Sequence, residues 1–121
     1  MAIKKVLIVD DSPTERHVLR EMLTKAGYDV IASDNGEDAI LKAKHDRPDV
    51  ILMDVVMPGL NGFQATRMIA RDPATKAIPI IMCTSKSQET DKIWGMRQGA
   101  RSYIVKPINR DELLAKIAAL D

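Results

Sequence analysis

Residues 50–62 read V-I-L-M-D-V-V-M-P-G-L-N-G, and this stretch decides the fold. Its first four residues are apolar and rich in branched side chains, which is too short a run for a helix and typical of a buried strand. Asp54 ends the run, and residues 57–62 carry the turn signals Pro-Gly and Asn-Gly. Taken alone, Asp54 either caps a loop or marks a site. The second reading has a physical basis, because open α/β sheets bind ligands at the C-terminal ends of their strands.

The composition is that of one globular domain. The chain has 121 residues, of which 45% are hydrophobic and 29% charged. Eighteen basic and 17 acidic side chains leave a net charge of +1, which argues against a dedicated nucleic-acid binder. We see no signal peptide and no apolar run of transmembrane length, so we expect a cytoplasmic protein. The single cysteine, Cys83, lies in an apolar run and is expected to be a buried, unreactive thiol.

Short apolar runs alternate with amphipathic segments along the whole chain. Strands are predicted at residues 5–9, 28–32, 50–53, 78–83 and 101–105. Helices are predicted to follow Ser12-Pro13, Asn35-Gly36 and Gly62, to span residues 87–98, and to follow Asn109. Five alternations predict parallel strands, right-handed crossovers and helices on both faces. The fold class is therefore α/β, a single doubly wound (βα)5 domain over residues 1–121.

Local signals refine three of these helices. Ser12 with Glu15, and Asn109 with Glu112, match the capping-box pattern. Gly95 is the weakest point of the fourth helix, because glycine costs a helix interior about 1 kcal/mol relative to alanine. The apolar face of the first helix is predicted to consist of Val18, Leu19, Met22, Leu23 and Ala26.

Polar residues follow four of the predicted strands. Asp10 and Asp11 follow the first, Asp54 the third, Thr84 the fourth and Lys106 the fifth. If these strands are neighbours, three carboxylates meet at one edge, and one would keep its proton unless a cation joined them. Magnesium suits such a site best, because it takes one or two carboxylates and completes its shell with water and phosphate oxygens.

Asp54 is then a metal ligand only, or a nucleophile as well, since carboxylates form aspartyl-phosphate intermediates. Lys106 would neutralise charge on an arriving phosphoryl group, and the Thr84 hydroxyl would donate to one of its oxygens. Each residue taken singly also has an ordinary role, as a surface lysine, a strand end or a helix-capping acid. Their joint occurrence at successive strand ends is what favours a site.

Four motifs make the chain resemble a response-regulator receiver domain of the CheY-like fold over essentially its whole length. They are V-D-D ending at Asp11, L-M-D-V-V-M-P around Asp54, C-T-S around Thr84, and Y-I-V-K-P from Tyr103 to Pro107. The resemblance implies a flavodoxin/CheY-like five-stranded parallel sheet with strand order 2-1-3-4-5. It also implies that Asp54 accepts a phosphoryl group from a histidine kinase.

The same resemblance implies the remaining site roles. Magnesium would be held by Asp11, Asp54 and the backbone carbonyl of Val56, with Asp10 acting through water. Lys106 would grip the phosphoryl group, and the Lys106–Pro107 peptide would be cis. Thr84 and Tyr103 would form a switch pair, and the fourth helix, fifth strand and fifth helix would present the signal to a downstream effector protein. Neither a DNA-binding domain nor a membrane partner is expected.

Three longer phrases resemble single-domain receivers of the type IV pilus twitching-motility system. They are D-S-P-T-E at 11–15, M-P-G-L-N-G-F-Q-A-T-R at 57–67 and Q-E-T-D-K-I-W-G-M-R-Q-G-A-R at 88–101. One departure from the wider family is the apolar Val56, where many receivers carry a polar side chain.

Three other classes remain to be weighed. A haloacid-dehalogenase phosphatase carries its nucleophile after the first strand in a D-x-D pattern, whereas Asp10 and Asp11 are adjacent here. A flavodoxin-like module needs a glycine- and hydroxyl-rich phosphate loop there, and the two acids would repel the phosphate. A degenerate receiver that only binds partners is disfavoured, because all five site residues are present. The receiver is therefore a phosphoacceptor signalling protein rather than a conventional enzyme.

Overall fold

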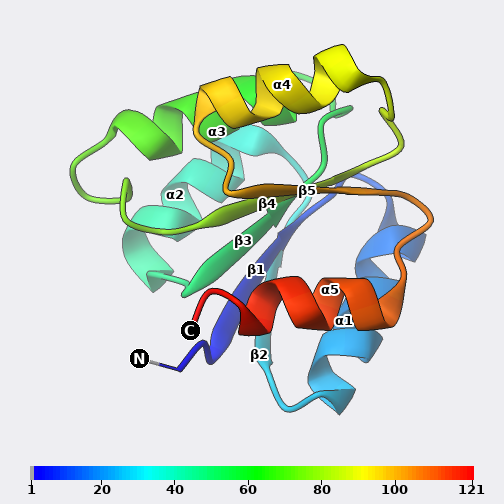
Figure 1. The fold of residues 1–121 in the computed structure, drawn as a ribbon. Coiled ribbons are helices and arrows are strands. Elements are labelled where there is room, and N and C mark those ends of the chain that lie inside the picture. The colour runs from blue at the N-terminus through cyan, green and yellow to red at the C-terminus, as the bar shows by residue number, and fades with distance from the viewer. Residues whose placement is uncertain (1) are drawn as a thin grey trace.

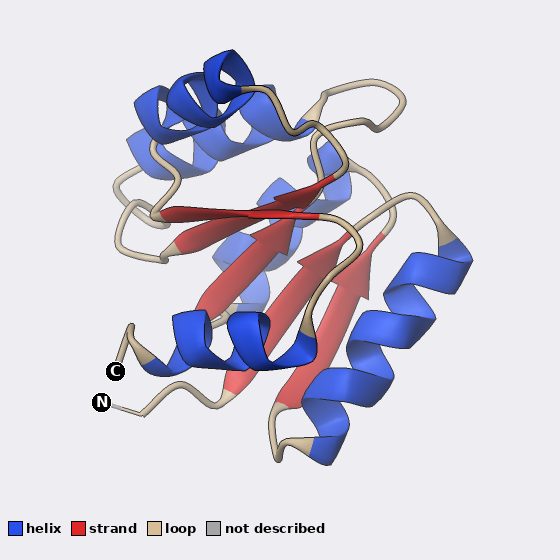
Figure 2. Cartoon of the chain, turned by 45° about the vertical axis from the view of Figure 1, so that its right-hand side comes forward, coloured by secondary structure: helices blue, strands red, loops and turns tan. Residues whose placement is uncertain are grey.

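The computed structural model describes residues 2–121, which form one five-stranded parallel sheet with helices on both of its faces (Figures 1 and 2). The strand order is β2-β1-β3-β4-β5, which confirms the expected topology. The elements in chain order are β1 (Lys5–Val9), α1 (Pro13–Lys25), β2 (Asp29–Ser33), α2 (Gly36–Asp46), β3 (Val50–Met53), α3 (Gly62–Arg71), β4 (Ile80–Thr84), α4 (Glu89–Gln98), β5 (Ser102–Val105) and α5 (Arg110–Ala118).

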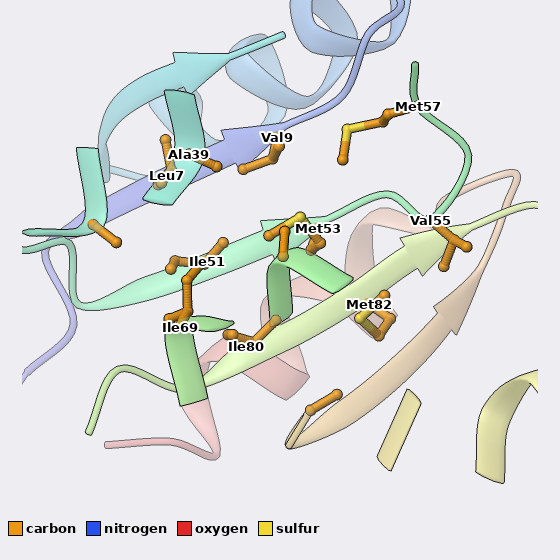
Figure 3. Close-up of a cluster of buried hydrophobic side chains, with 13 residues drawn as sticks. Leu7, Val9, Ala39, Ile51, Met53, Val55, Met57, Ile69, Ile80 and Met82 are labelled. Carbon is orange, nitrogen blue, oxygen red and sulfur yellow. The ribbon is translucent and has the colours of Figure 1, made fainter. Parts of the chain in front are cut away.

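The sheet separates two hydrophobic cores, because successive side chains of a strand point to opposite faces. On one face the strands pack against α2 and α3, through residues such as Leu7, Ile51, Ala39 and Ile69 (Figure 3). On the other face the strands pack against α1 and α5 through a second hydrophobic cluster, which includes Ile8, Leu52, Leu19 and Leu113. β1, β3 and β4 contribute to both cores, so they read as continuous apolar runs rather than alternating ones.

The boundaries of β2, β4 and β5 differ from the predicted ones by one or two residues. β4 begins at Ile80 instead of residue 78, because Pro79 has no N–H to give to a ladder, although its carbonyl oxygen accepts the Ile51 N–H at 3.0 Å. β2 is displaced by one residue and ends at Ser33, which pairs with Val9. The central strand β3 is Val50–Met53, as predicted, and all four of its residues are buried.

Helix ends also depart from the sequence patterns. The side chains of Ser12 and Asn109 accept the backbone N–H of Glu15 and Glu112 respectively. Each predicted capping box thus has the hydrogen bond to its N-cap side chain. In α3 both hydrogen bonds of a capping box are formed, between Asn61 and Gln64. α4 begins at Glu89, two residues later than predicted, with Gln88 as its N-cap.

The predicted apolar face of α1 was too wide. Leu19 and Leu23 are buried and Met22 is partly buried, but Val18 and Ala26 are exposed. A short helix on one face of a sheet buries only a narrow stripe, so its flanking apolar residues remain in solvent. Cys83 is buried as expected, and burial raises the pKa of its thiol to about 12. Among residues 2–121, no helix is both long and apolar enough to cross a membrane.

Candidate functional site

The ends of β1 and β3 bring two carboxylates together. The Asp54 N–H donates to the Val9 carbonyl at 2.9 Å, and the Asp10 N–H donates to the Ser33 carbonyl at 3.2 Å. Sheet-like hydrogen bonding therefore continues one residue past each strand and holds the backbone of both acids. Asp10 is 1% exposed and Asp54 7% exposed, so both side chains are buried at the C-terminal edge of the sheet.

Lys106 reaches this edge from the far strand of the sheet. Its N–H donates to the Thr84 carbonyl at 2.8 Å, which fixes the end of β5 beside β4. Its Nζ lies 2.7 Å from Asp10 Oδ2 and 3.4 Å from Asp54 Oδ2, and the lysine side chain is only 12% exposed. The shorter ion pair belongs to Asp10, which leaves the Asp54 carboxylate less firmly paired. The Lys106–Pro107 peptide is cis, as expected.

Asp11 completes an acidic cluster with Asp10 and Asp54. Each of the three offers a carboxylate oxygen, and these oxygens lie within 4.8 Å of one another. Asp11 is exposed, whereas the other two are buried, so the cluster opens to solvent on one side. An all-oxygen donor set with an open side suits a hard divalent cation that keeps part of its water shell.

Burial and charged neighbours together set the ionisation of Asp54 and Lys106. Burial raises the pKa of the Asp54 carboxyl; the Lys106 ammonium lowers it and the Asp10 carboxylate raises it again, and the net effect is upward. Burial by itself lowers the pKa of Lys106, but its hydrogen bond to Asp10 and the charges of Asp54 and Glu15 outweigh this and hold the pKa above its ordinary value. The ammonium is thus firmly charged, while the Asp54 carboxylate lacks full compensation.

The predicted switch residues meet at one backbone unit. Thr84 is fully buried, and its Oγ1 accepts the Lys86 N–H at 3.3 Å. The Tyr103 hydroxyl donates to the Lys86 carbonyl at 2.8 Å. The main chain of Lys86 therefore connects Thr84 with Tyr103, which packs at the edge of the core.

Three neighbours of the site were not anticipated from the sequence. Arg16 donates through Nη1 to the Asp10 carbonyl at 2.7 Å, and the Glu15 carboxylate lies 3.8 Å from Lys106 Nζ. Both follow from the start of α1, which aims its first turn at the strand ends. The third is Gly62, where an added Cβ would lie 1.9 Å from the Asp54 carbonyl oxygen, so that only glycine lets α3 begin this close to β3. Its Asn-Gly turn signal was visible, but the contact was not.

A shallow cavity of about 250 Å³ adjoins the site. The loops after β3 and β4 supply most of its lining, which comprises Val55, Val56, Met57, Asn61, Phe63 and Lys86. Val56 is 56% exposed, whereas the neighbouring Val55 is 2% exposed. An apolar side chain two residues after Asp54 therefore stands in solvent beside the approach to the carboxylate.

This arrangement defines a class of protein, namely a doubly wound α/β domain with an acidic, lysine-containing site at its strand ends. The sequence matches the response regulator receiver domain family over residues 6–118, and the chain belongs to that family. It is accordingly a response regulator domain. Domains of this family act in phosphorelays, where they take a phosphoryl group from a histidine kinase.

Relatives and solved structures agree with this assignment. The chain is similar to protein PilH of Pseudomonas aeruginosa, with 55% identity over 116 residues, covering 96% of each chain. The structure is similar to the chemotaxis protein CheY4 of Vibrio cholerae, with a TM-score of 0.91, 36% identity, and coverage of 99% of this chain and all of that one. It is also similar to the receiver domain of sensor histidine kinase PA1611 of Pseudomonas aeruginosa, with a TM-score of 0.90, 33% identity and 98% coverage of both chains. That receiver domain was solved with a magnesium ion in its active-site cleft.

Proposed function

We propose that Asp54 is the residue that accepts the phosphoryl group, from the phosphohistidine of a partner kinase. One observation carries this proposal: a buried carboxylate, at the end of the central strand, lies 3.4 Å from a charged ammonium that is itself paired more closely with another acid. In the reaction a carboxylate oxygen of Asp54 attacks phosphorus, and the phosphorus–nitrogen bond to the histidine breaks as the acyl phosphate forms.

The residues around Asp54 fit a magnesium ion. Asp11 and Asp54, together with the backbone carbonyl of Val56, would hold it, and Asp10 would contact it through water. Support comes from the three clustered carboxylate oxygens and from the magnesium in the PA1611 receiver domain. When bound, magnesium would offset negative charge on both the carboxylates and the phosphoryl oxygens.

Lys106 and Thr84 would complete the site. Lys106 is already charged and mostly buried, so little solvent has to rearrange when its ammonium contacts a phosphoryl oxygen. The Thr84 hydroxyl sits at the end of β4 and would donate to a second oxygen. The chain would therefore catalyse only its own phosphorylation and the later loss of the phosphoryl group.

The output would pass through α4, β5 and α5. A phosphoryl group on Asp54 gives Thr84 a new acceptor, and movement of Thr84 changes the Lys86 backbone that Tyr103 also contacts. The effector protein would read this surface. The likeness to PilH favours a cytoplasmic regulator of the PilH type that acts in type IV pilus twitching motility. We propose that the signal is passed by protein contact, with neither DNA nor a membrane as the partner.

The test is mass spectrometry after incubation with acetyl phosphate and magnesium. The parent chain should gain one phosphoryl group, located at Asp54. Asp54→Asn preserves the side-chain size but removes the nucleophile, so it should gain none, whereas the matched control Asp49→Asn at the other end of β3 should be labelled like the parent. Labelling of Asp54→Asn would refute the assignment, and continuous turnover without a labelled protein would indicate a phosphatase.

Magnesium is tested separately by thermal unfolding. A ligand that binds only the native state raises the unfolding temperature by mass action. Millimolar magnesium should raise that of the parent chain and raise that of Asp11→Asn less. Superimposable melts of the parent with and without magnesium would contradict the proposed site.

A further inference from the structure

Gly95 is an unexpected residue at the centre of α4. A glycine weakens a helix interior relative to alanine, because it loses more backbone freedom on folding and packs no side chain. Gly95 is nevertheless the buried residue of α4, whereas Ile93, Trp94 and Met96 are about half exposed. The helix thus turns its glycine toward the sheet and three of its apolar side chains outward, which calls for a reason in the packing.

The reason is the ring of Tyr103. A Cβ added at Gly95 would lie 3.3 Å from both Cδ2 and Cε2 of Tyr103, and 3.5 Å from Met82 Cγ. Contacts of 3.3 Å are tighter than ordinary van der Waals contact, so the ring would have to give way. The ring therefore lies tightly against position 95, and a methyl group there would require it to shift by a few tenths of an ångström.

The far end of the ring is held as well. The Tyr103 hydroxyl donates to the Lys86 carbonyl at 2.8 Å, and the ring packs against the core that contains Met82. Because the hydroxyl is held at Lys86, movement of the ring away from position 95 would lengthen and weaken this hydrogen bond. Burial, together with the negative charges of Asp91 and Asp54, raises the pKa of the hydroxyl to about 12, so it remains a donor at neutral pH.

We propose that Gly95 is a positioning residue for Tyr103: its missing side chain makes the space under α4 that lets the ring pack inward with its hydroxyl on Lys86. The identity of residue 95 then sets the fraction of molecules in which Tyr103 is packed inward. The signalling consequence rests on the proposed role of Tyr103 as the switch residue, whereas the positioning itself does not. A methyl group at position 95 would favour the outward ring and bias the surface of α4 and β5 toward one state.

A double-mutant cycle tests the contact without any phosphoryl donor. In a Tyr103→Ala background the ring is gone, so Gly95→Ala should act through helix propensity alone and raise the unfolding temperature by about 4 °C. In the parent, and in Tyr103→Phe, which keeps the ring, the same substitution should raise it by much less or lower it. An equal rise in all three backgrounds would overturn the proposal, and so would a fall in all three, which would place the clash with Met82 or the backbone.

NMR of the Gly95→Ala variant provides the second measurement. The ring signals of Tyr103 and the amide of Lys86 should shift away from their parent positions, because the ring leaves α4 and its hydroxyl leaves Lys86. Unchanged signals would overturn the positioning role even if the variant is less stable.

The same spectra, recorded with magnesium and beryllium fluoride as a phosphoryl mimic, connect the contact to signalling. In the parent the mimic should move the Thr84 and Tyr103 signals, and in Gly95→Ala the Tyr103 response should be reduced by at least half. A parent that ignores the mimic would refute the proposed function but not the positioning, which the cycle decides by itself. A full Tyr103 response in Gly95→Ala would overturn the inference.

Discussion

The β1–β3 pair and the α4–β5 pair are built in opposite ways. Every residue of β3 is buried, and so are four of the five residues of β1, with apolar contacts on both faces of the sheet. In α4 the buried residue is a glycine, and in β5 only Ile104 is fully buried. The apolar residues of α4 are not missing but lie at the surface, where Trp94 is 49% exposed.

This difference in packing distinguishes the acidic site at the ends of β1 and β3 from the surface formed by α4 and β5. Asp10 and Asp54 extend strands whose position is over-determined by packing, so the distances within the site are held closely. Elements with few buried apolar contacts belong to the low-stability end of a structure and change conformation at small cost. The same short chain thus combines a closely held acidic site with a surface that can change conformation.

The largest expected effect tests this difference in packing by truncating one side chain in each pair of elements. Leu52→Ala in β3 removes a side chain that is 1% exposed and should cost about 3 kcal/mol, through lost transfer energy and a residual cavity. Trp94→Ala in α4 should cost no more than about 0.5 kcal/mol. Urea unfolding with an unchanged m-value measures both, and equal costs would show that the two pairs are packed alike.

A smaller effect concerns the stability cost of burying the Asp54 carboxylate. The raised pKa of Asp54 means that the native state binds its proton more tightly than the unfolded state does. Stability therefore falls as the pH rises from 3.8 through the raised native value, and the whole cost is present at neutral pH. Asp54→Asn removes this cost and should stabilise the protein at pH 7.

The control lies at the other end of β3. Asp49 accepts the N–H groups of Lys5 at 2.9 Å and Lys4 at 2.8 Å, and these bonds, with the nearby lysine charges, hold its pKa below 3.8 against a modest cost of burial. The Asp49 carboxylate therefore stabilises the fold above pH 3.8, and this stabilisation is lost as the pH falls through the lower native pKa. Asp49→Asn should accordingly lower the free energy of unfolding at pH 7. The loss should be less than about 1 kcal/mol, because the site is largely solvated. Thermal melts from pH 3 to pH 8 would compare the variants, and a parallel loss in both would contradict the opposite shifts.

The smallest predicted effect is on the rate of phosphoryl loss, and it concerns the loops that follow β3 and β4. Val56 projects into solvent and, with Lys86, lines the cavity beside Asp54. A valine gives no hydrogen bond to a water that would attack the acyl phosphate, whereas an asparagine can orient one. We expect Val56→Asn to lose its phosphoryl group about threefold faster, which corresponds to about 0.7 kcal/mol of barrier. The measurement is the decay of phosphorylated protein at equal magnesium, and an unchanged rate would remove Val56 from the control of lifetime.

Sequence patterns predicted the order and type of all ten elements, because each strand is a short apolar run and each helix carries a cap or a turn signal. The stretch at residues 50–62 placed Asp54 at a strand end, and the same reasoning placed Asp10, Thr84 and Lys106. The width of the α1 face and the start of α4 were wrong, since local patterns do not show how much of a helix a sheet covers.

What the sequence determined by itself is therefore the list of groups and the edge at which they gather, because hydrophobic periodicity and strand direction are local properties. The tertiary structure alone decided that Lys106 pairs more closely with Asp10 than with Asp54, and that Arg16 reaches the Asp10 carbonyl. It also decided why Gly95 stands in a helix: eight residues along the chain, Tyr103 returns to fill the space that a side chain would have taken. Such facts depend on distances between elements, and these are set by the packing of the whole chain.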